Sequence, residues 1–145
     1  PRLTPDQLEH MLLMSADDVD APGWDQLTGY GRLNARKALE ADPDYYLYAE
    51  LHRLVPSKEA GRTVIQAFGT VGGSHWGNYS LEVAEVENPT QWRKAGKLTG
   101  GQAKDTILGT LTSQDFGKPG RWTVRIVAQD GKGQSRESRM GFTLQ

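Results

Sequence analysis

Apolar residues recur at helical spacing near the start of the chain. Leu8, Met11, Leu12 and Ser15 lie three and four positions apart and would share one face of a helix. The residues TPDQ just before them have the order of a capping box, in which threonine caps the first turn and glutamine bonds back to it. Because proline is favoured at the first helical position, the pattern predicts a helix that begins at Pro5.

A second, shorter helix is predicted after an irregular loop. Residues 17–31 are interrupted by glycine and proline, which favour turns over regular structure. Asn34 can cap a helix that continues through Glu40. The Asp-Pro pair at 42–43 ends it, because the residue before a proline is disfavoured in helical geometry.

From position 45 onward the chain consists of short runs rich in β-branched and aromatic residues, separated by clusters of Gly, Pro, Asn and Asp. In one run Trp122, Val124, Ile126 and Ala128 alternate with polar residues, which is typical of a strand with one buried face. An Asp-Gly turn signal at 130–131 predicts a hairpin between this run and the last. The seven predicted strands are 46–55, 63–71, 78–86, 92–98, 106–112, 121–128 and 137–144.

These patterns predict a mainly β protein in two parts. Two short α-helices would occupy residues 1–43, and a seven-stranded immunoglobulin- or fibronectin-like β-sandwich would occupy residues 44–145. A helix of about 12 residues is marginal alone, so the apolar face of the first helix needs a partner. We expect it to dock on the sandwich or on a second copy of the chain, forming a homodimer, or else to fray.

Composition narrows the classes of partner. The chain of 145 residues has 17 Lys and Arg against 18 Asp and Glu, a formal net charge of -1, so no basic excess favours nucleic acid. Cysteine is absent, which excludes disulfides and thiolate metal sites. No apolar run approaches the roughly 20 residues that span a bilayer, so no membrane span is predicted.

The first part of the chain resembles a known protein family. Residues 3–39, LTPDQLEHMLLMSADDVDAPGWDQLTGYGRLNARKAL, resemble the C-terminal end of the catalytic domain of subtilisin-like serine proteases, the subtilases. The resemblance lies in three motifs in the family's order and spacing. They are Thr-Pro at 4–5, Ser-Ala-Asp at 15–17 and GYGRLNA at 29–35.

The second part resembles the β-sandwich modules that follow the catalytic domain in some secreted bacterial subtilases. The matching segments are a Tyr-x-Leu strand at 79–81, an Asn-Pro-Thr-x-Trp loop at 88–92 and a Gly-x-Trp-Thr-x-Arg strand at 120–125. The resemblance implies an immunoglobulin- or fibronectin-like accessory module.

Taken together, the resemblances imply that the chain is a C-terminal fragment of a secreted or cell-surface bacterial serine protease. A subtilase needs serine, histidine and aspartate in hydrogen-bond reach, and in the family all three lie upstream of the matching residues. The three histidines present, His10, His52 and His75, have no recognisable nucleophile motif nearby. The fragment is therefore expected not to be an enzyme, and its partner would be the catalytic domain of the parent protease.

Exposed aromatic residues are the candidates for ligand binding. Trp76 lies in a glycine-rich loop beside His75, and Trp92 follows an Asn-Pro-Thr segment. Flat aromatic faces bind sugar rings or peptides through apolar contact. By contrast, Tyr79 and Trp122 alternate with aliphatic residues and are assigned to the core.

One loop contains clustered carboxylates, which can supply oxygen ligands to calcium. The residues are Asp17, Asp18, Asp20 and Asp25, and their spacing is not that of an EF-hand. A solvated loop is the favoured interpretation, calcium is the alternative, and no other cofactor is expected.

Two other classes of function are retained for the β region. An exposed, coplanar aromatic set would indicate a carbohydrate-binding module that takes a polysaccharide. Without such a set, the region could be a structural spacer or folding aid for the protease. As an accessory domain, it would assist substrate binding, surface attachment or stability.

Overall fold

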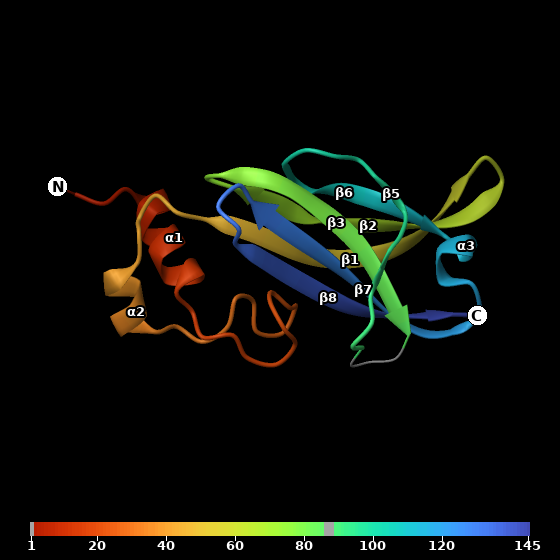
Figure 1. Ribbon diagram of the computed structural model, residues 1–145, viewed down its shortest axis with the longest axis horizontal. Coiled ribbons are helices and arrows are strands. Elements are labelled where there is room, and N and C mark those ends of the chain that lie inside the picture. The colour runs from red at the N-terminus through yellow and green to blue at the C-terminus, as the bar shows by residue number, and fades with distance from the viewer. Residues whose placement is uncertain (1, 86–88) are drawn as a thin grey trace.

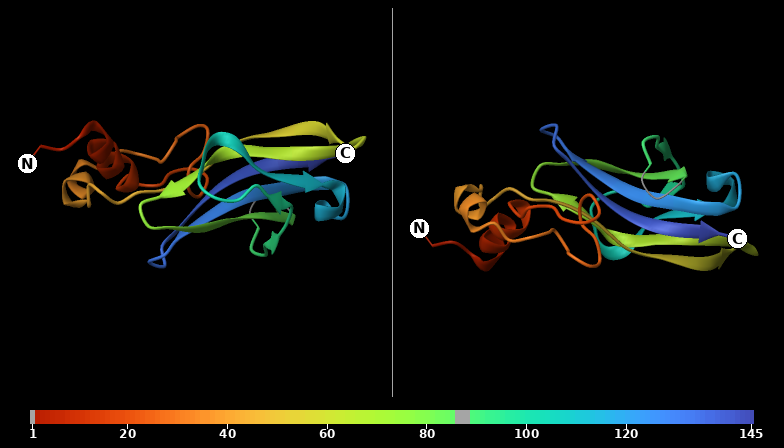
Figure 2. Two further views of the ribbon diagram at one scale, coloured as in Figure 1. Left: turned by 90° about the horizontal axis from the view of Figure 1, so that it is seen from above. Right: turned by 90° about the horizontal axis from the view of Figure 1, so that it is seen from below.

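The computed structural model describes residues 2–85 and 89–145. It is mainly β, with two antiparallel sheets packed face to face, here called the sandwich, and two short helices at one end (Figure 1). Both views in Figure 2 place these helices at the end of the sandwich away from the C-terminus. The mainly β class predicted from the sequence is confirmed.

The two N-terminal helices begin where their caps predict. Helix α1 spans Pro5–Met14, and Thr4 Oγ1 accepts a hydrogen bond from the Gln7 amide at 3.1 Å while the Gln7 side chain accepts one from the Thr4 amide at 2.9 Å. Helix α2 spans Ala35–Glu40, and Asn34 Oδ1 accepts a hydrogen bond from the Lys37 amide at 3.0 Å. Each cap satisfies an amide that the helix itself leaves unpaired.

Each sheet has four strands. The first sheet has the order β1-β2-β6-β5 and the second the order β4-β3-β7-β8. The bounds in the first sheet are Leu47–Glu59 for β1, Arg62–Gly73 for β2, Ala103–Thr112 for β6 and Lys97–Leu98 for β5. In the second sheet they are Arg93–Lys94 for β4, Trp76–Glu85 for β3, Gly120–Asp130 for β7 and Ser135–Leu144 for β8. A short helix α3, Ser113–Phe116, precedes β7.

The prediction of seven strands is wrong by one, because the predicted strand 92–98 divides in two. Its first half, β4, pairs with β3, and its second half, β5, pairs with β6 in the other sheet. The chain changes sheets at Ala95, whose amide donates to Leu81 O at 2.9 Å, and at Gly96, which has φ +74°. That left-handed conformation suits glycine, and a Cβ there would lie 2.8 Å from Thr110 O. The last residue of the predicted strand 78–86 lies outside the described residues.

The core lies between the two sheets. The predicted inner face of β7 is buried from Trp122 to Ala128 at alternate positions, and Tyr79 is buried with it as predicted. The Tyr79 hydroxyl donates to Leu108 O at 2.6 Å and accepts from the Gly100 amide at 2.9 Å. Tyr79 therefore joins β3 of the second sheet to β6 of the first.

The predicted hairpin is present, since β7 and β8 pair from Gly120 with Leu144 to Gln129 with Ser135. Asp130 holds its turn, because its carboxylate accepts hydrogen bonds from the amides of Lys132 and Gln134 at 2.9 Å each. Within the described residues no helix is long and apolar enough to cross a membrane.

The N-terminal segment docks on the sandwich, where β1 and β8 form neighbouring edges. Ser138, fully buried in β8, donates from Oγ to Trp24 O at 2.6 Å and accepts from the Leu51 amide at 2.9 Å. Two further hydrogen bonds hold the end of α1. Met14 Sδ accepts one from the Leu47 amide, and Met14 O accepts one from the Arg136 side chain. Docking on the sandwich, one of the expected arrangements, is thus present. Met11 of the predicted apolar face is buried, whereas Leu8 is 48% exposed.

Replacing Ser138 with alanine should destabilise the protein by about 1–3 kcal/mol, because the buried Leu51 amide would lose its acceptor. Urea unfolding measures the loss, and amide exchange should show faster exchange at Leu51. Ser135→Ala, on the exposed end of the same strand, is the matched control. Equal stability of the two variants would contradict a bridging role for the Ser138 hydroxyl.

Candidate functional site: the groove beside helix α1

The two tryptophans predicted to bind ligand lie apart. Trp76 is the first residue of β3, is half-buried against the core, and its ring centroid lies 6.3 Å from that of Tyr79. Trp92 precedes β4, which pairs with the opposite end of β3 at Glu82 and Val83. Seven strand positions separate Trp76 from Val83, which is about 23 Å at 3.3 Å per residue. Trp76 and Trp92 therefore do not form a shared platform.

His75 is exposed next to Trp76. Its backbone carbonyl accepts a hydrogen bond from the Gly131 amide at 2.7 Å. This contact joins the loop before β3 to the turn of the β7–β8 hairpin. The predicted Asn-Pro-Thr loop at 88–90 begins outside the described residues.

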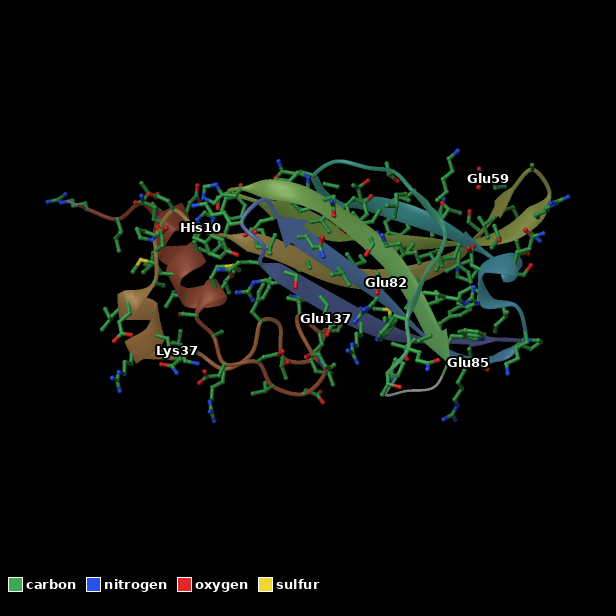
Figure 3. The ribbon with its side chains drawn as sticks, in the orientation of Figure 1. His10, Lys37, Glu59, Glu82, Glu85 and Glu137 are labelled. Atoms are coloured by element: carbon green, nitrogen blue, oxygen red, sulfur yellow. The ribbon has the colours of Figure 1, made fainter. Side chains whose placement is uncertain are left out.

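The ring of Trp92 lies against two arginine side chains of the same chain. The guanidinium carbons of Arg125 and Arg139 lie 4.1 and 5.0 Å from its ring centroid. Glu82 and Glu137, whose labels lie over the second sheet in Figure 3, neutralise these arginines through ion pairs of 2.5 to 3.1 Å. This outer face is thus a half-buried network of paired charges.

The carboxylates considered for calcium are used in local hydrogen bonds. The donors are Lys37 and Asn34 for Asp17, the Gly23 amide for Asp18, and Thr28 with the Leu27 amide for Asp25. The hydrogen bond from Lys37 holds the pKa of Asp17 below its ordinary value. Asp20 is exposed, with φ +64°. In the described ranges no three histidine or acidic side chains are grouped to hold a metal ion.

An open groove of about 540 Å³ lies between α1 and the outer face of the first sheet. Glu9 and Leu13 of α1 line one wall, and Tyr46, Tyr48 and Glu50 line the other. Residues 70–72 and 102–104, from β2 and the start of β6, complete it. The volume falls within the range of about 300–1,000 Å³ that small-molecule sites occupy.

Four rings form a row, and the two middle ones, Tyr46 and Tyr48, line the groove. His10 stacks on Tyr46 with ring centroids 4.4 Å apart and planes inclined by 17°. Tyr46 and Tyr48 follow at 5.2 Å, and Tyr48 and Tyr30 at 5.9 Å. Figure 3 shows His10 on α1 close to the start of β1. The row therefore joins the helix, the strand and the intervening loop.

Two carboxylates, Glu9 and Glu50, and one ammonium group, Lys104, line the groove. Burial, followed by the charges of Glu9 and Glu50, raises the pKa of Tyr48 to about 12. Burial, the charge of Glu50 and a hydrogen bond also raise the pKa of Tyr30, whose hydroxyl donates to Glu50 Oε2 at 2.7 Å. Both shifts have the sign expected when an anion would form beside carboxylates.

A polar chain continues from Glu50 along the strand. Glu50 Oε1 lies 3.0 Å from His52 Nε2, and His52 Nδ1 lies 3.1 Å from Asp105 Oδ1. The ring of Trp24 lies 5.1 Å from that of His52, and Gln26 donates to the His52 carbonyl. The hydrogen-bonding partners of the His52 side chain are thus two carboxylates.

None of the sequence motifs indicated this groove. Tyr46, Tyr48, Glu50 and His52 alternate within the predicted strand 46–55, and that spacing alone places them on one face. The alternation was therefore the available signal. The helix and loop residues at the groove, from Glu9 to Tyr30, lie 20 to 41 positions upstream of Glu50 and carry no such signal.

Comparison with known proteins adds no assignment: no protein-family model, curated protein or solved structure matches the chain. The candidate function therefore rests on the sequence motifs and on the contacts described above.

Replacing Tyr30 with phenylalanine should lower stability at pH 7 by about 1.5–3 kcal/mol, because Glu50 loses a donor to a charged group. The folded state raises the pKa of Tyr30, so this stabilisation is complete below the ordinary tyrosine pKa of about 10 and is lost as pH rises above it. Urea unfolding at pH 7 to 11 should show the two proteins converging. Tyr46→Phe is the control, and its stability should stay close to that of the unchanged protein at every pH. A stability loss in Tyr30→Phe that stays constant up to pH 11 would contradict the role of the Tyr30 hydroxyl.

Proposed function

We propose that the chain is the C-terminal, non-catalytic region of a secreted subtilisin-like serine protease. Its first part would be the end of the catalytic domain, and the sandwich would be an accessory domain. The three motifs at 4–5, 15–17 and 29–35 support this parentage through their order and spacing. In the parent, a serine, histidine and aspartate upstream of this region would cleave peptide bonds through an acyl-serine intermediate.

The packing of the motifs against each other supports the same proposal. The backbones of Asp17 and Arg32 exchange two hydrogen bonds of 2.8 Å, which joins the second motif to the third. Gly31 lies at this contact with φ +113°, and a Cβ there would be 2.1 Å from Asp17 O. The glycine of the third motif is therefore required by a close backbone approach.

The distribution of exposed apolar side chains carries the proposal. Of the six large hydrophobic residues that are exposed in the described ranges, five lie in residues 3–39; they are Leu3, Leu8, Leu27, Leu33 and Leu39. Leu27 and Leu39 are 86% and 83% exposed. Burying such a side chain is worth about 1.5–3 kcal/mol, so a catalytic domain covering this segment would gain substantially.

We further propose that the sandwich is immunoglobulin-like. The orders β1-β2-β6-β5 and β4-β3-β7-β8 correspond to the A-B-E-D and C′-C-F-G sheets of that architecture. The chain would change sheets between C′ and D, where β4 gives way to β5.

Stabilisation is the accessory role that the contacts favour. Ser138 and Arg136 of the sandwich hold the N-terminal segment at Trp24 and Met14. The sandwich would thereby fix the end of the catalytic domain. The separation of Trp76 from Trp92 gives no support to a carbohydrate platform.

The parentage is tested in the full-length secreted protein. We expect its upstream sequence to contain the Gly-Thr-Ser-Met-Ala nucleophile motif, and the protein to hydrolyse casein until a serine-directed inhibitor is added. The 145-residue chain alone should show no turnover. Removal of residues 44–145 should lower the melting temperature of the protease. An upstream region without protease motifs would contradict the proposal.

The proposed contact between residues 3–39 and the catalytic domain is tested by the double variant Leu27→Gln and Leu39→Gln. In the 145-residue chain it should leave the urea midpoint unchanged, because both side chains already contact water. In the full-length protease it should cost about 1.5–3 kcal/mol for each side chain that the catalytic domain covers. Leu98→Gln, at an exposed leucine of β5, is the control expected to be neutral in both proteins. If the double variant leaves the stability of the full-length protease unchanged, the proposed contact with the catalytic domain is contradicted.

A further inference from the structure

We propose that the groove beside α1 binds a basic side chain, the lysine or arginine of a peptide, against the ring of Tyr48 and beside the carboxylates of Glu9 and Glu50. The site belongs to this chain alone, so the inference does not depend on the parentage proposed above.

Aromatic rings elsewhere in the chain already bind cations. Arg53 lies 4.2 Å from the ring centroid of Phe68, and Arg125 lies 4.1 Å from that of Trp92. In the described part of the chain no arginine or lysine is placed over the ring of Tyr48, which lines the open groove. One face of Tyr46 is covered by the stacked ring of His10. A cation within about 6 Å of such a ring is attracted by its negative face.

The walls of the groove supply the counter-charges. Glu9 is exposed on α1, and Glu50 is half-buried on β1 with its two oxygens held by Tyr30 and His52. These contacts fix the orientation of the Glu50 carboxylate before any ligand arrives. Burial, followed by the charges of Glu9 and Glu50, raises the pKa of Tyr48, so both carboxylates act on this ring.

The dimensions suit an extended basic side chain in a wider peptide site. The space is larger than one side chain, and Lys104 and Gln102 line its β6 end. A peptide that places its cationic head beside Glu9 and Glu50 would offer a carbonyl or carboxylate to Lys104. An anionic ligand at the tyrosine rings would instead meet two carboxylates.

The test uses the 145-residue chain and two short peptides, acetyl-Gly-Arg-Gly-amide and the same peptide with citrulline, the neutral isostere of arginine. Amide chemical-shift changes should appear at Glu9, Tyr46, Tyr48 and Thr70 with the arginine peptide, and its affinity should exceed that of the citrulline peptide at least about fivefold. The preference should shrink between about 20 mM and about 500 mM NaCl, because salt screens exposed charges.

Variants separate the two components of the site. Glu9→Gln and Tyr48→Leu should each weaken binding of the arginine peptide about two- to fivefold, the range expected for a partly exposed cation–π or ion-pair contact. Tyr48→Phe should retain binding, because it keeps the ring. Glu59→Gln, on the β1–β2 hairpin at the end of the molecule away from His10 in Figure 3, is the matched charge control and should be neutral.

Three results would overturn the proposal. They are equal binding of the arginine and citrulline peptides, shift changes that map away from the groove, and no binding of either peptide at about 10 mM. Amide shifts of the unliganded variants verify that each one folds, so a loss of binding in a folded Tyr48→Leu protein reports on the site itself.

Discussion

The buried hydroxyl of Ser138 is the contact on which the arrangement of the chain depends. It accepts from Leu51 in the first sheet and donates to Trp24 in the N-terminal loop, while its own backbone belongs to the second sheet. Both partners are far away in sequence, at separations of 87 and 114 residues. A buried amide left without an acceptor is costly, so this one side chain constrains three segments at once.

The same contact explains how the sandwich protects its edges. Unpaired edge strands present free amides and carbonyls to other chains. Here the N-terminal loop lies along the neighbouring edges of β1 and β8, where Trp24 bridges to Ser138 and Gln26 donates to the His52 carbonyl. The loop thus directs polar contacts toward the sandwich, while Leu27 near its tip remains exposed. This division of surfaces is the one that the proposed parentage predicts.

The groove is a product of this docking. Glu9 comes from α1, Tyr46 directly precedes β1, and Tyr48 and Glu50 lie at the start of β1. They meet because the N-terminal segment is fixed beside the first sheet, where His10 and Tyr30 contact the two tyrosine rings. Tyr30 then both holds Glu50 and ends the row of rings. Structural support and the proposed recognition of cations therefore share residues, as expected where a site is built on a rigid scaffold.

The sequence alone determined the features that depend on neighbours in the chain. The caps at Thr4 and Asn34 join residues three positions apart, and the alternation of β7 follows from the two-residue period of a strand, so both were predictable. Only the tertiary structure decided the change of sheets at Gly96, the position of Trp92 over two arginines and the assembly of the groove. These features depend on contacts such as His52 with Asp105, 53 positions apart. Spacing along the chain fixes which face a side chain occupies, whereas the packing of the whole chain fixes what that face meets.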